Sequence, residues 1–234
     1  MNIIKRLWAK RWMLHSILST IYFNFHYLPF RQAIFLPIGL YKCKFVKLKG
    51  KVKIETGEPL KPGMISLGRY AVSIYPNNGF IYENHGGMIV FKGSCSIGNN
   101  SAVSLGPNGT IVFGDKFTAT SSLRLVCYNR ITFDCKVSVG WECTFMDTDF
   151  HKMKKLSGGY TKGYGEIKIG QGCWFCNRCV ILKNTETAEF STFSSCSVLN
   201  RKYDVPYAIY SSHAVELKIQ GLYRDIDDDI IDYN

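Results

Sequence analysis

The sequence predicts an all-β solenoid, a parallel β-helix, together with a basic, aromatic and partly helical N-terminal extension. The first observation is a six-residue period that recurs between residues 91 and 199. The second is charge, because the whole positive excess lies in residues 1–54. The third is composition. Of 234 residues 46% are hydrophobic and 20% charged, which excludes a disordered, solvating chain.

The six-residue period is clearest in residues 169–199. The first position of each hexad is mostly bulky and apolar, at Ile169, Phe175, Ile181, Thr187, Phe193 and Leu199. The fifth position is small, at Cys173, Cys179, Thr185, Ser191 and Ser197. A helix repeats every 3.6 residues and a simple strand every 2, so neither explains this register. Three short strands per triangular coil explain it, with both positions stacked inward on neighbouring coils.

The same register occurs upstream. First positions fall at Phe91, Ile97, Val103, Phe113, Ala119, Phe133, Val139 and Phe145, and fifth positions at Cys95, Ser101, Val137 and Cys143. A glycine often follows the first position, as at Gly98, Gly114, Gly140 and Gly170. We interpret these glycines as tight corners that use positive φ.

The N-terminal segment is strongly basic. Residues 1–54 hold eleven Lys and Arg and no Asp or Glu, whereas the rest of the chain holds 18 cations against 18 anions. Interleaved aromatics are Trp8, Trp12, Tyr22, Phe23, Phe25, Tyr27, Phe30 and Phe35. Two interpretations stay open. Residues 1–53 make peripheral contact with an anionic membrane surface, or the aromatics pack on the body while the cations face water.

Two other interpretations of this segment are disfavoured. Residues 12–30 are uncharged, but a membrane-spanning helix would have to bury His15, Ser16, Ser19, Asn24 and His26 in lipid. A nucleic-acid partner is not expected, because the neutral body lacks a wider basic footprint.

Two runs of sequence resemble the hexapeptide-repeat acyltransferases. The first is residues 131–141 followed by Met146-Asp147-Thr148-Asp149-Phe150-His151, and the second is residues 167–170 with 173–179 and Ile181-Leu182-Lys183. The chain is most similar to the O-acetyltransferases of surface-polysaccharide synthesis, and residues 22–30 resemble a segment that precedes the repeats in some members. This resemblance implies a left-handed parallel β-helix and a homotrimer with acyl-CoA bound between subunits. The handedness rests on the resemblance alone, since most parallel crossovers are right-handed.

The expected organisation has three parts. Residues 1–60 form the extension, residues 61–204 the β-helix with a protruding loop at 152–166, and residues 205–234 a C-terminal segment with an acidic tail. The loop either covers the acceptor pocket or is an insertion without function. The tail holds five Asp between Asp225 and Asp232, and is either solvated or a partner of the basic extension.

The resemblance implies that His151 is the general base of an acetyl transfer from acetyl-CoA to a sugar hydroxyl. Counting six from Phe145 also places this imidazole where the repeat calls for an apolar side chain, and such a break in a regular pattern often marks a site. The alternative is a satisfied or solvent-facing histidine. Asp147 or Asp149 could orient the imidazole, although corner capping is an equal alternative for each.

The resemblance also implies the residues that bind acetyl-CoA. They are Trp174, Cys176, Lys183, Ser194, Ser195, Arg201 and Ser212. Several depart from the family pattern, because Ser211-Ser212-His213-Ala214 replaces a Gly-Asn-Pro-Ala run and Cys176, Ser194 and Ser195 replace glycine or alanine. A second function therefore stays open, a non-catalytic β-helix trimer that binds a glycan or a protein. For the enzyme, the acceptor is a glycan or a lipid-linked sugar.

The cysteines predict reduced thiols rather than a metal site. Nine Cys is an odd count and too few for a disulfide scaffold, so we expect a cytoplasmic protein, at the inner face of the membrane if the extension binds lipid. The spacing Cys173-x-x-Cys176-x-x-Cys179 resembles a metal-binding motif. Cys173 and Cys179 occupy the inward slot, however, and Cys176 a corner, so the three do not converge. We expect no metal.

Overall fold

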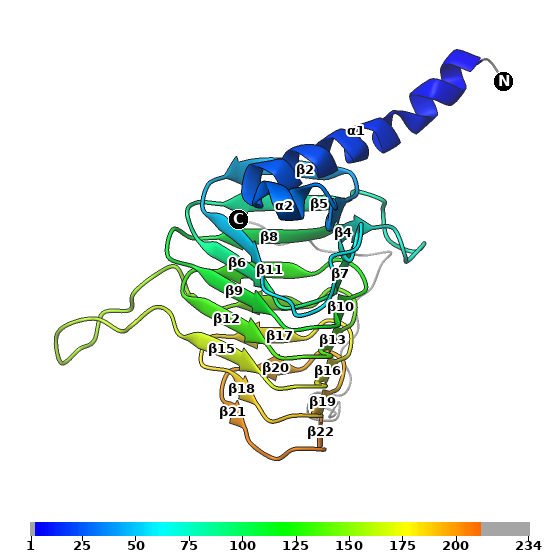
Figure 1. The fold of residues 1–234 in the computed structure, drawn as a ribbon. Coiled ribbons are helices and arrows are strands. Elements are labelled where there is room, and N and C mark those ends of the chain that lie inside the picture. The colour runs from blue at the N-terminus through cyan, green and yellow to red at the C-terminus, as the bar shows by residue number, and fades with distance from the viewer. Residues whose placement is uncertain (1–2, 212–234) are drawn as a thin grey trace, which may run out of the picture.

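The computed structural model describes the backbone of residues 3–211 and the side chains of residue 13 and residues 15–211. The described chain is a left-handed parallel β-helix with a helical cap at its N-terminal end (Figure 1). Helix α1 (Ile3–Tyr27) projects from the body and is followed by the short α2 (Phe30–Ala33). The predicted acidic tail, Ser212 and His213 lie outside the described residues.

Three parallel sheets form the three sides of the coils. Sheet A contains β1 (Ile38–Leu40), β4 (Ile65–Arg69), β7 (Cys95–Gly98), β10 (Phe117–Ala119), β13 (Ser138–Val139), β16 (Trp174–Phe175), β19 (Thr192–Phe193) and β22 (Ile209–Tyr210). Sheet B contains β2 (Cys43–Leu48), β5 (Phe80–Asn84), β8 (Ser101–Leu105), β11 (Arg124–Cys127), β14 (Thr144–Met146), β17 (Val180–Leu182) and β20 (Val198–Leu199). Sheet C contains β3 (Lys51–Ile54), β6 (Met88–Phe91), β9 (Thr110–Phe113), β12 (Arg130–Phe133), β15 (Glu166–Ile169), β18 (Glu186–Thr187) and β21 (Lys202–Tyr203).

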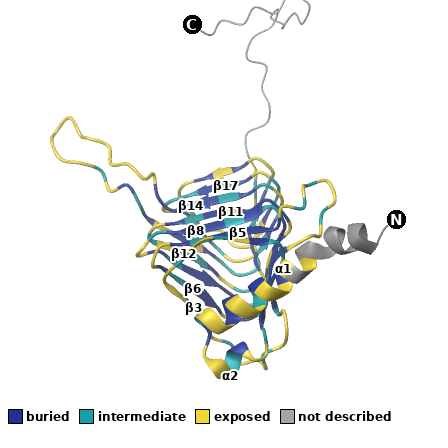
Figure 2. Ribbon diagram, turned by 90° about the horizontal axis from the view of Figure 1, so that it is seen from above, coloured by how far each residue is buried: buried dark blue, intermediate teal, exposed yellow. Residues whose placement is uncertain are grey.

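The core is the stack of inward side chains that the hexads predict. Every first-position and fifth-position residue named above is buried. Successive coils pair in register, so that Phe91, Phe113 and Phe133 align across sheet C. The rings of Phe113 and Phe133 stack with centroids 5.5 Å apart. Figure 2 shows this narrow buried interior and the exposed corners around it.

The explanation offered for the corner glycines is wrong. None of Gly98, Gly114, Gly140 and Gly170 has positive φ. Positive φ falls two residues later, at Asn100, Lys116, Glu142 and Gly172. The glycines are needed for close approach between coils instead, since a Cβ on Gly98 would stand 1.8 Å from the carbonyl oxygen of Thr120.

The solenoid begins at β1 and continues to β22, so coil structure extends into both flanking segments defined from the sequence. The sequence does not reveal the first coil, because β2 and β3 carry outward lysines that resemble a solvated charge run, namely Lys44, Lys47, Lys51 and Lys53. Inward residues such as Val52 and Ile54 are nevertheless buried.

Helix α1 caps the open edge of sheet A. Its side chains at positions i, i+4 and i+8 accept hydrogen bonds from alternate residues of the first coil. The spacings match because four helical residues and two strand residues both span about 6 Å. The three bonds run from the N–H groups of Lys42, Leu40 and Ile38 to the side-chain oxygens of Ser16, Thr20 and Asn24, at 3.0, 2.9 and 3.1 Å.

One face of the extension thus packs on the body, as the second interpretation held. Phe23 and Leu28 are buried there, and the Phe23 ring meets Tyr82 edge-on at 5.0 Å. Among the helices described, none combines the length and the hydropathy needed to cross a bilayer. Contact with a membrane surface stays a prediction.

Candidate active site

The solenoid has one long described excursion at the corner between sheets B and C. Residues 147–165 leave the coil after β14 and return at β15 as a two-stranded arm, which stands away from the body (Figure 1). Antiparallel bridges join Thr148 to Tyr164 and Lys154 to Tyr160. At its base the Tyr164 ring packs on Tyr128 of the preceding coil, with centroids 5.3 Å apart. The arm is therefore tied to the solenoid at one end.

His151 lies on the outgoing strand of this arm and is exposed. The register argument for it is wrong, because the chain has already left the coil and the next inward residue is Ile167, which pairs with Ile131. Of the two alternatives, the solvent-facing histidine describes this chain. Its imidazole makes no hydrogen bond to any described residue, and its carbonyl lies against Gly163, where a Cβ would approach that oxygen to 2.6 Å.

Asp147 is buried at the base of the arm. Its Oδ1 accepts the Tyr128 N–H at 2.7 Å and its Oδ2 the Asn129 N–H at 2.8 Å. Both carboxylate oxygens are thereby used to hold the turn of the preceding coil. In a single chain Asp147 acts as a corner cap rather than as a partner of His151.

Asp149 differs from Asp147, because its carboxylate is exposed and forms an ion pair with Lys183 of the next coil. The Asp149 N–H donates to Gly163 O at 2.7 Å, which fixes its backbone within the arm. Thr148, between the two aspartates, accepts the Phe150 N–H at 3.0 Å. The sequence prediction missed this turn, in which Phe150 adopts a left-handed conformation. Its sequence signal is Thr148 itself, because a Thr hydroxyl can bond the backbone two residues further on.

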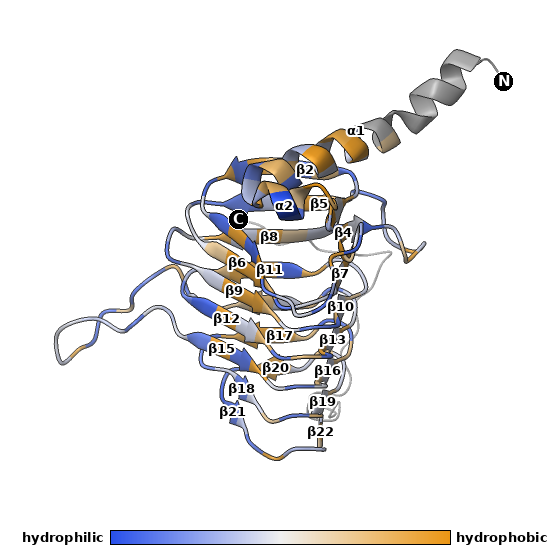
Figure 3. Cartoon of the chain, in the orientation of Figure 1, coloured by the Kyte–Doolittle hydropathy of each residue, from blue (hydrophilic) through white to orange (hydrophobic). Residues whose placement is uncertain are grey.

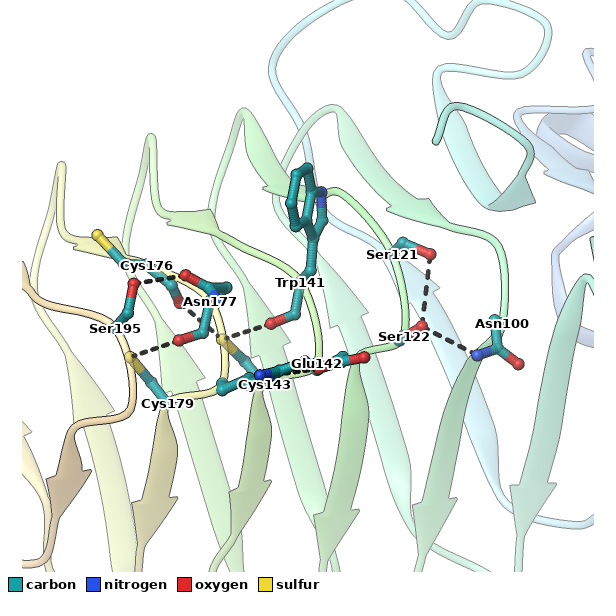
Figure 4. A network of polar contacts seen from close by, with 11 residues as sticks. Asn100, Ser121, Ser122, Trp141, Glu142, Cys143, Cys176, Asn177, Cys179 and Ser195 are labelled. Atoms are coloured by element: carbon teal, nitrogen blue, oxygen red, sulfur yellow. Dashed lines mark hydrogen bonds and ion pairs between the residues drawn. The ribbon is translucent and has the colours of Figure 1, made fainter. Parts of the chain in front are cut away.

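The corner between sheets A and B holds a second group of the predicted residues (Figure 4). Cys176, Ser194 and Ser195 follow β16 and β19 there, and Ser195 Oγ donates to the side-chain oxygen of Asn177. The hydrogen bond from Arg178, at 2.6 Å, holds the pKa of the nearby Glu142 below its usual range.

Two thiols at this corner, those of Cys143 and Cys176, are held in the protonated form. Burial raises the pKa of Cys176, and hydrogen bonding to Cys179 together with burial raises that of Cys143. Cys143 Sγ donates to the carbonyl oxygen of Cys176 at 3.0 Å. Cys173 and Cys179 face the core while Cys176 sits at the corner, in accordance with the register. Among residues 3–211 no three His, Cys, Asp or Glu side chains form a group that could hold a metal ion.

One chain therefore places the predicted site residues at two separate corners. His151, Asp149, Lys183 and Arg201 lie along the corner between sheets B and C, where the Arg201 guanidinium covers Tyr203 at 5.5 Å. Cys176, Ser194 and Ser195 lie along the corner between sheets A and B, and Trp174 is exposed on sheet A. The predicted site is not assembled within a single protomer.

Comparison with known proteins yields a structural likeness and no sequence relative. No family model matches the chain, and no curated protein matches it. One solved structure that resembles it is the crystal structure of NeuO, described as a polySia-specific acetyltransferase. It is 13% identical, with a TM-score of 0.41 over 81% of this chain and 92% of that one.

Proposed function

We propose that this protein is an O-acetyltransferase that moves an acetyl group from acetyl-CoA to a sugar hydroxyl. The observation that supports it is the position of His151. An exposed imidazole without a partner among the described residues stands on a tethered arm, close in sequence to the Asp149–Lys183 ion pair. An imidazole that is accessible and not committed to a structural hydrogen bond is suited to proton transfer at neutral pH.

The chemistry follows from that position. A neutral ring nitrogen of His151 accepts the proton of the acceptor hydroxyl as its oxygen attacks the thioester carbonyl. The tetrahedral intermediate then collapses, the C–S bond breaks, and the imidazolium returns the proton to the CoA sulfur. No acyl-enzyme forms in this route, in keeping with the raised pKa values of the Cys143 and Cys176 thiols.

The proposal includes a homotrimer with a shared site. Two features support it. The arm exposes large apolar side chains that no described residue covers, namely Phe150, Met153, Leu156 and Tyr160. In a cyclic assembly, each subunit also presents one surface to its neighbour and receives a different one, so the two corners that are separate in one chain can face each other across an interface.

The corner between sheets A and B fits the thin pantetheine chain of acetyl-CoA, since Cys176, Ser194 and Ser195 are small. Lys183 and Arg201, at the other corner, are the two predicted binding residues that carry a positive charge, and we assign them to its phosphates. The acceptor proposed is a glycan or a lipid-linked sugar.

The test is thiol release from acetyl-CoA across a panel of glycans. His151→Asn keeps much of the shape of the side chain but has no basic nitrogen to accept the proton. Turnover should therefore fall by about 100-fold or more, while CoA binding is retained. His85→Asn is the matched control, an exposed histidine at the same kind of corner that is paired with Glu83 at 3.0 Å.

Full turnover in His151→Asn would overturn the mechanism. If wild type binds glycan but shows no turnover, the result would instead support the non-catalytic trimer. The sequence argument for that alternative is that residues 211–214 depart from the family's Gly-Asn-Pro-Ala run.

A further inference from the structure

Helix α1 is arranged with its polar side toward the protein. Ser16 and Asn24 are buried against the first coil, where they and Thr20 satisfy the edge of β1. A surface helix of a globular protein usually does the reverse, burying an apolar stripe and exposing polar residues. Of the polar residues that argued against a membrane span, Ser16 and Asn24 thus bond to the solenoid edge and Ser19 is buried.

The outward side of the helical cap is mainly apolar, although His15, His26 and Arg31 are exposed on the same two helices. We call it the cap face, and Figure 3 shows its hydrophobic colouring along the described part of α1. Its exposed members are Met13, Ile17, Leu18, Ile21, Tyr22, Phe25, Phe30, Ile34 and Phe35. The Phe25 and Phe30 rings lie 6.0 Å apart, which makes the surface continuous from α1 to α2. Single exposed apolar residues are common in proteins, but a contiguous surface of this kind marks an interaction site.

Cations border the cap face. Lys44 and Lys47 are exposed on β2, whose Phe45 ring lies 6.1 Å from that of Tyr22. Beyond the end of α1, a cavity of about 760 Å³ has three lysines in its lining, Lys49, Lys51 and Lys53, against one carboxylate, Glu55. No Asp or Glu occurs before Glu55. The electrostatic partner of this end of the molecule is therefore an anion.

We propose that the cap face docks on an anionic lipid bilayer, with α1 lying in the interface plane. Apolar side chains then enter the boundary of headgroups and acyl chains, while the bordering lysines meet lipid phosphates. Pairing of two cap faces is disfavoured, because it would bring two segments of eleven cations and no anions together.

The test is co-sedimentation of the full-length protein with vesicles. Wild type should bind vesicles that contain phosphatidylglycerol and phosphatidylcholine, bind phosphatidylcholine alone more weakly, and dissociate as salt is raised. The triple variant Leu18→Gln, Ile21→Gln, Phe25→Gln should lose about 100-fold in partition, because three apolar contacts are removed while helix propensity is kept.

A matched control replaces three exposed apolar residues away from the cap, Ile74→Gln, Val205→Gln and Ile209→Gln, and should bind as wild type does. Equal circular dichroism and melting of the variants would show that each is folded. The proposal is overturned if wild type does not sediment with anionic vesicles, or if the cap triple variant binds unchanged. It is equally overturned if neither protein binds lipid and light scattering shows a smaller assembly for the cap variant, which would make this face a subunit interface.

Discussion

Replacement of Asp147 separates a structural role from a catalytic one. The sequence allows this residue either to orient His151 or to cap a corner, and the structure places its carboxylate on the backbone of the preceding coil. Asp147→Ala removes the acceptor of two N–H groups, those of Tyr128 and Asn129. We therefore predict a loss of stability that far exceeds any loss of turnover per folded molecule.

The magnitude follows from the contacts. Each buried donor left without an acceptor costs about 1–3 kcal/mol. The two N–H groups are partly buried, so water can reach them after the substitution, and we expect a total of about 2–4 kcal/mol. Asp147→Asn keeps one acceptor oxygen and should cost about half as much.

The assay is urea unfolding followed by circular dichroism, with all proteins at one protomer concentration because assembly would shift apparent stability. Asp149→Ala is the control, since it removes an exposed carboxylate whose ion pair with Lys183 contributes at most about 1 kcal/mol. Turnover is measured on the same samples below the unfolding transition.

A contrary outcome is easily recognised. If Asp147→Ala unfolds at the wild-type urea concentration but loses turnover and alters the pH profile of the rate, Asp147 acts on His151 in the assembled enzyme and the corner-cap assignment fails.

Two further predictions concern the core and acid stability. Phe133→Ala should cost about 3–5 kcal/mol, because the ring is buried and packed against Phe113 and Phe145, and a urea midpoint near that of wild type would contradict the stacked-core assignment. Asp115 tests pH dependence. Burial alone would raise its pKa, but hydrogen bonds from Ser94 and the contribution of Lys116 outweigh it, and the pKa is lowered. Because the folded pKa is the lower one, the stabilisation is present above the unfolded value of about 3.9 and lost as pH falls through the folded pKa. Asp115→Asn should therefore show a shallower loss of stability in urea titrations below about pH 5, and an unchanged slope would refute the assignment.

The position of the arm relates the fold to the proposed activity. A β-helix corner is normally a short turn between strands, and an excursion there leaves the stacked core intact. The chain can thus carry His151 into solvent while Phe145 and Ile167, on either side of the excursion, stay buried. The rigid scaffold and the variable site are physically separate.

The sequence by itself determined the inward direction of side chains along the solenoid. A six-residue period indicates that each coil has three short sides and shows which residue of each side faces inward. Residues such as Phe133, Cys143 and Phe193 are therefore assigned to the core from the sequence alone, and they are buried. Direction is a local property of an extended strand, in which alternate residues face opposite sides. The six-residue count no longer gives the side-chain direction where the coil is interrupted. For that reason the count from Phe145 misplaced His151.

Only the tertiary structure decided which residues meet between coils. Asp147 bonds to residues 18 and 19 positions earlier, Asp149 to a lysine 34 positions later, and Asn24 of the helix to β1. Such pairings depend on the number of residues in each coil. The hexads predict an interruption at 152–166, but the coil already ends after β14, before Asp147. The helical cap shows the same limit. Whether α1 presents its polar or its apolar side to the protein depends on the unpaired N–H groups at the edge of β1, because a buried edge must be hydrogen-bonded and only the folded solenoid creates one.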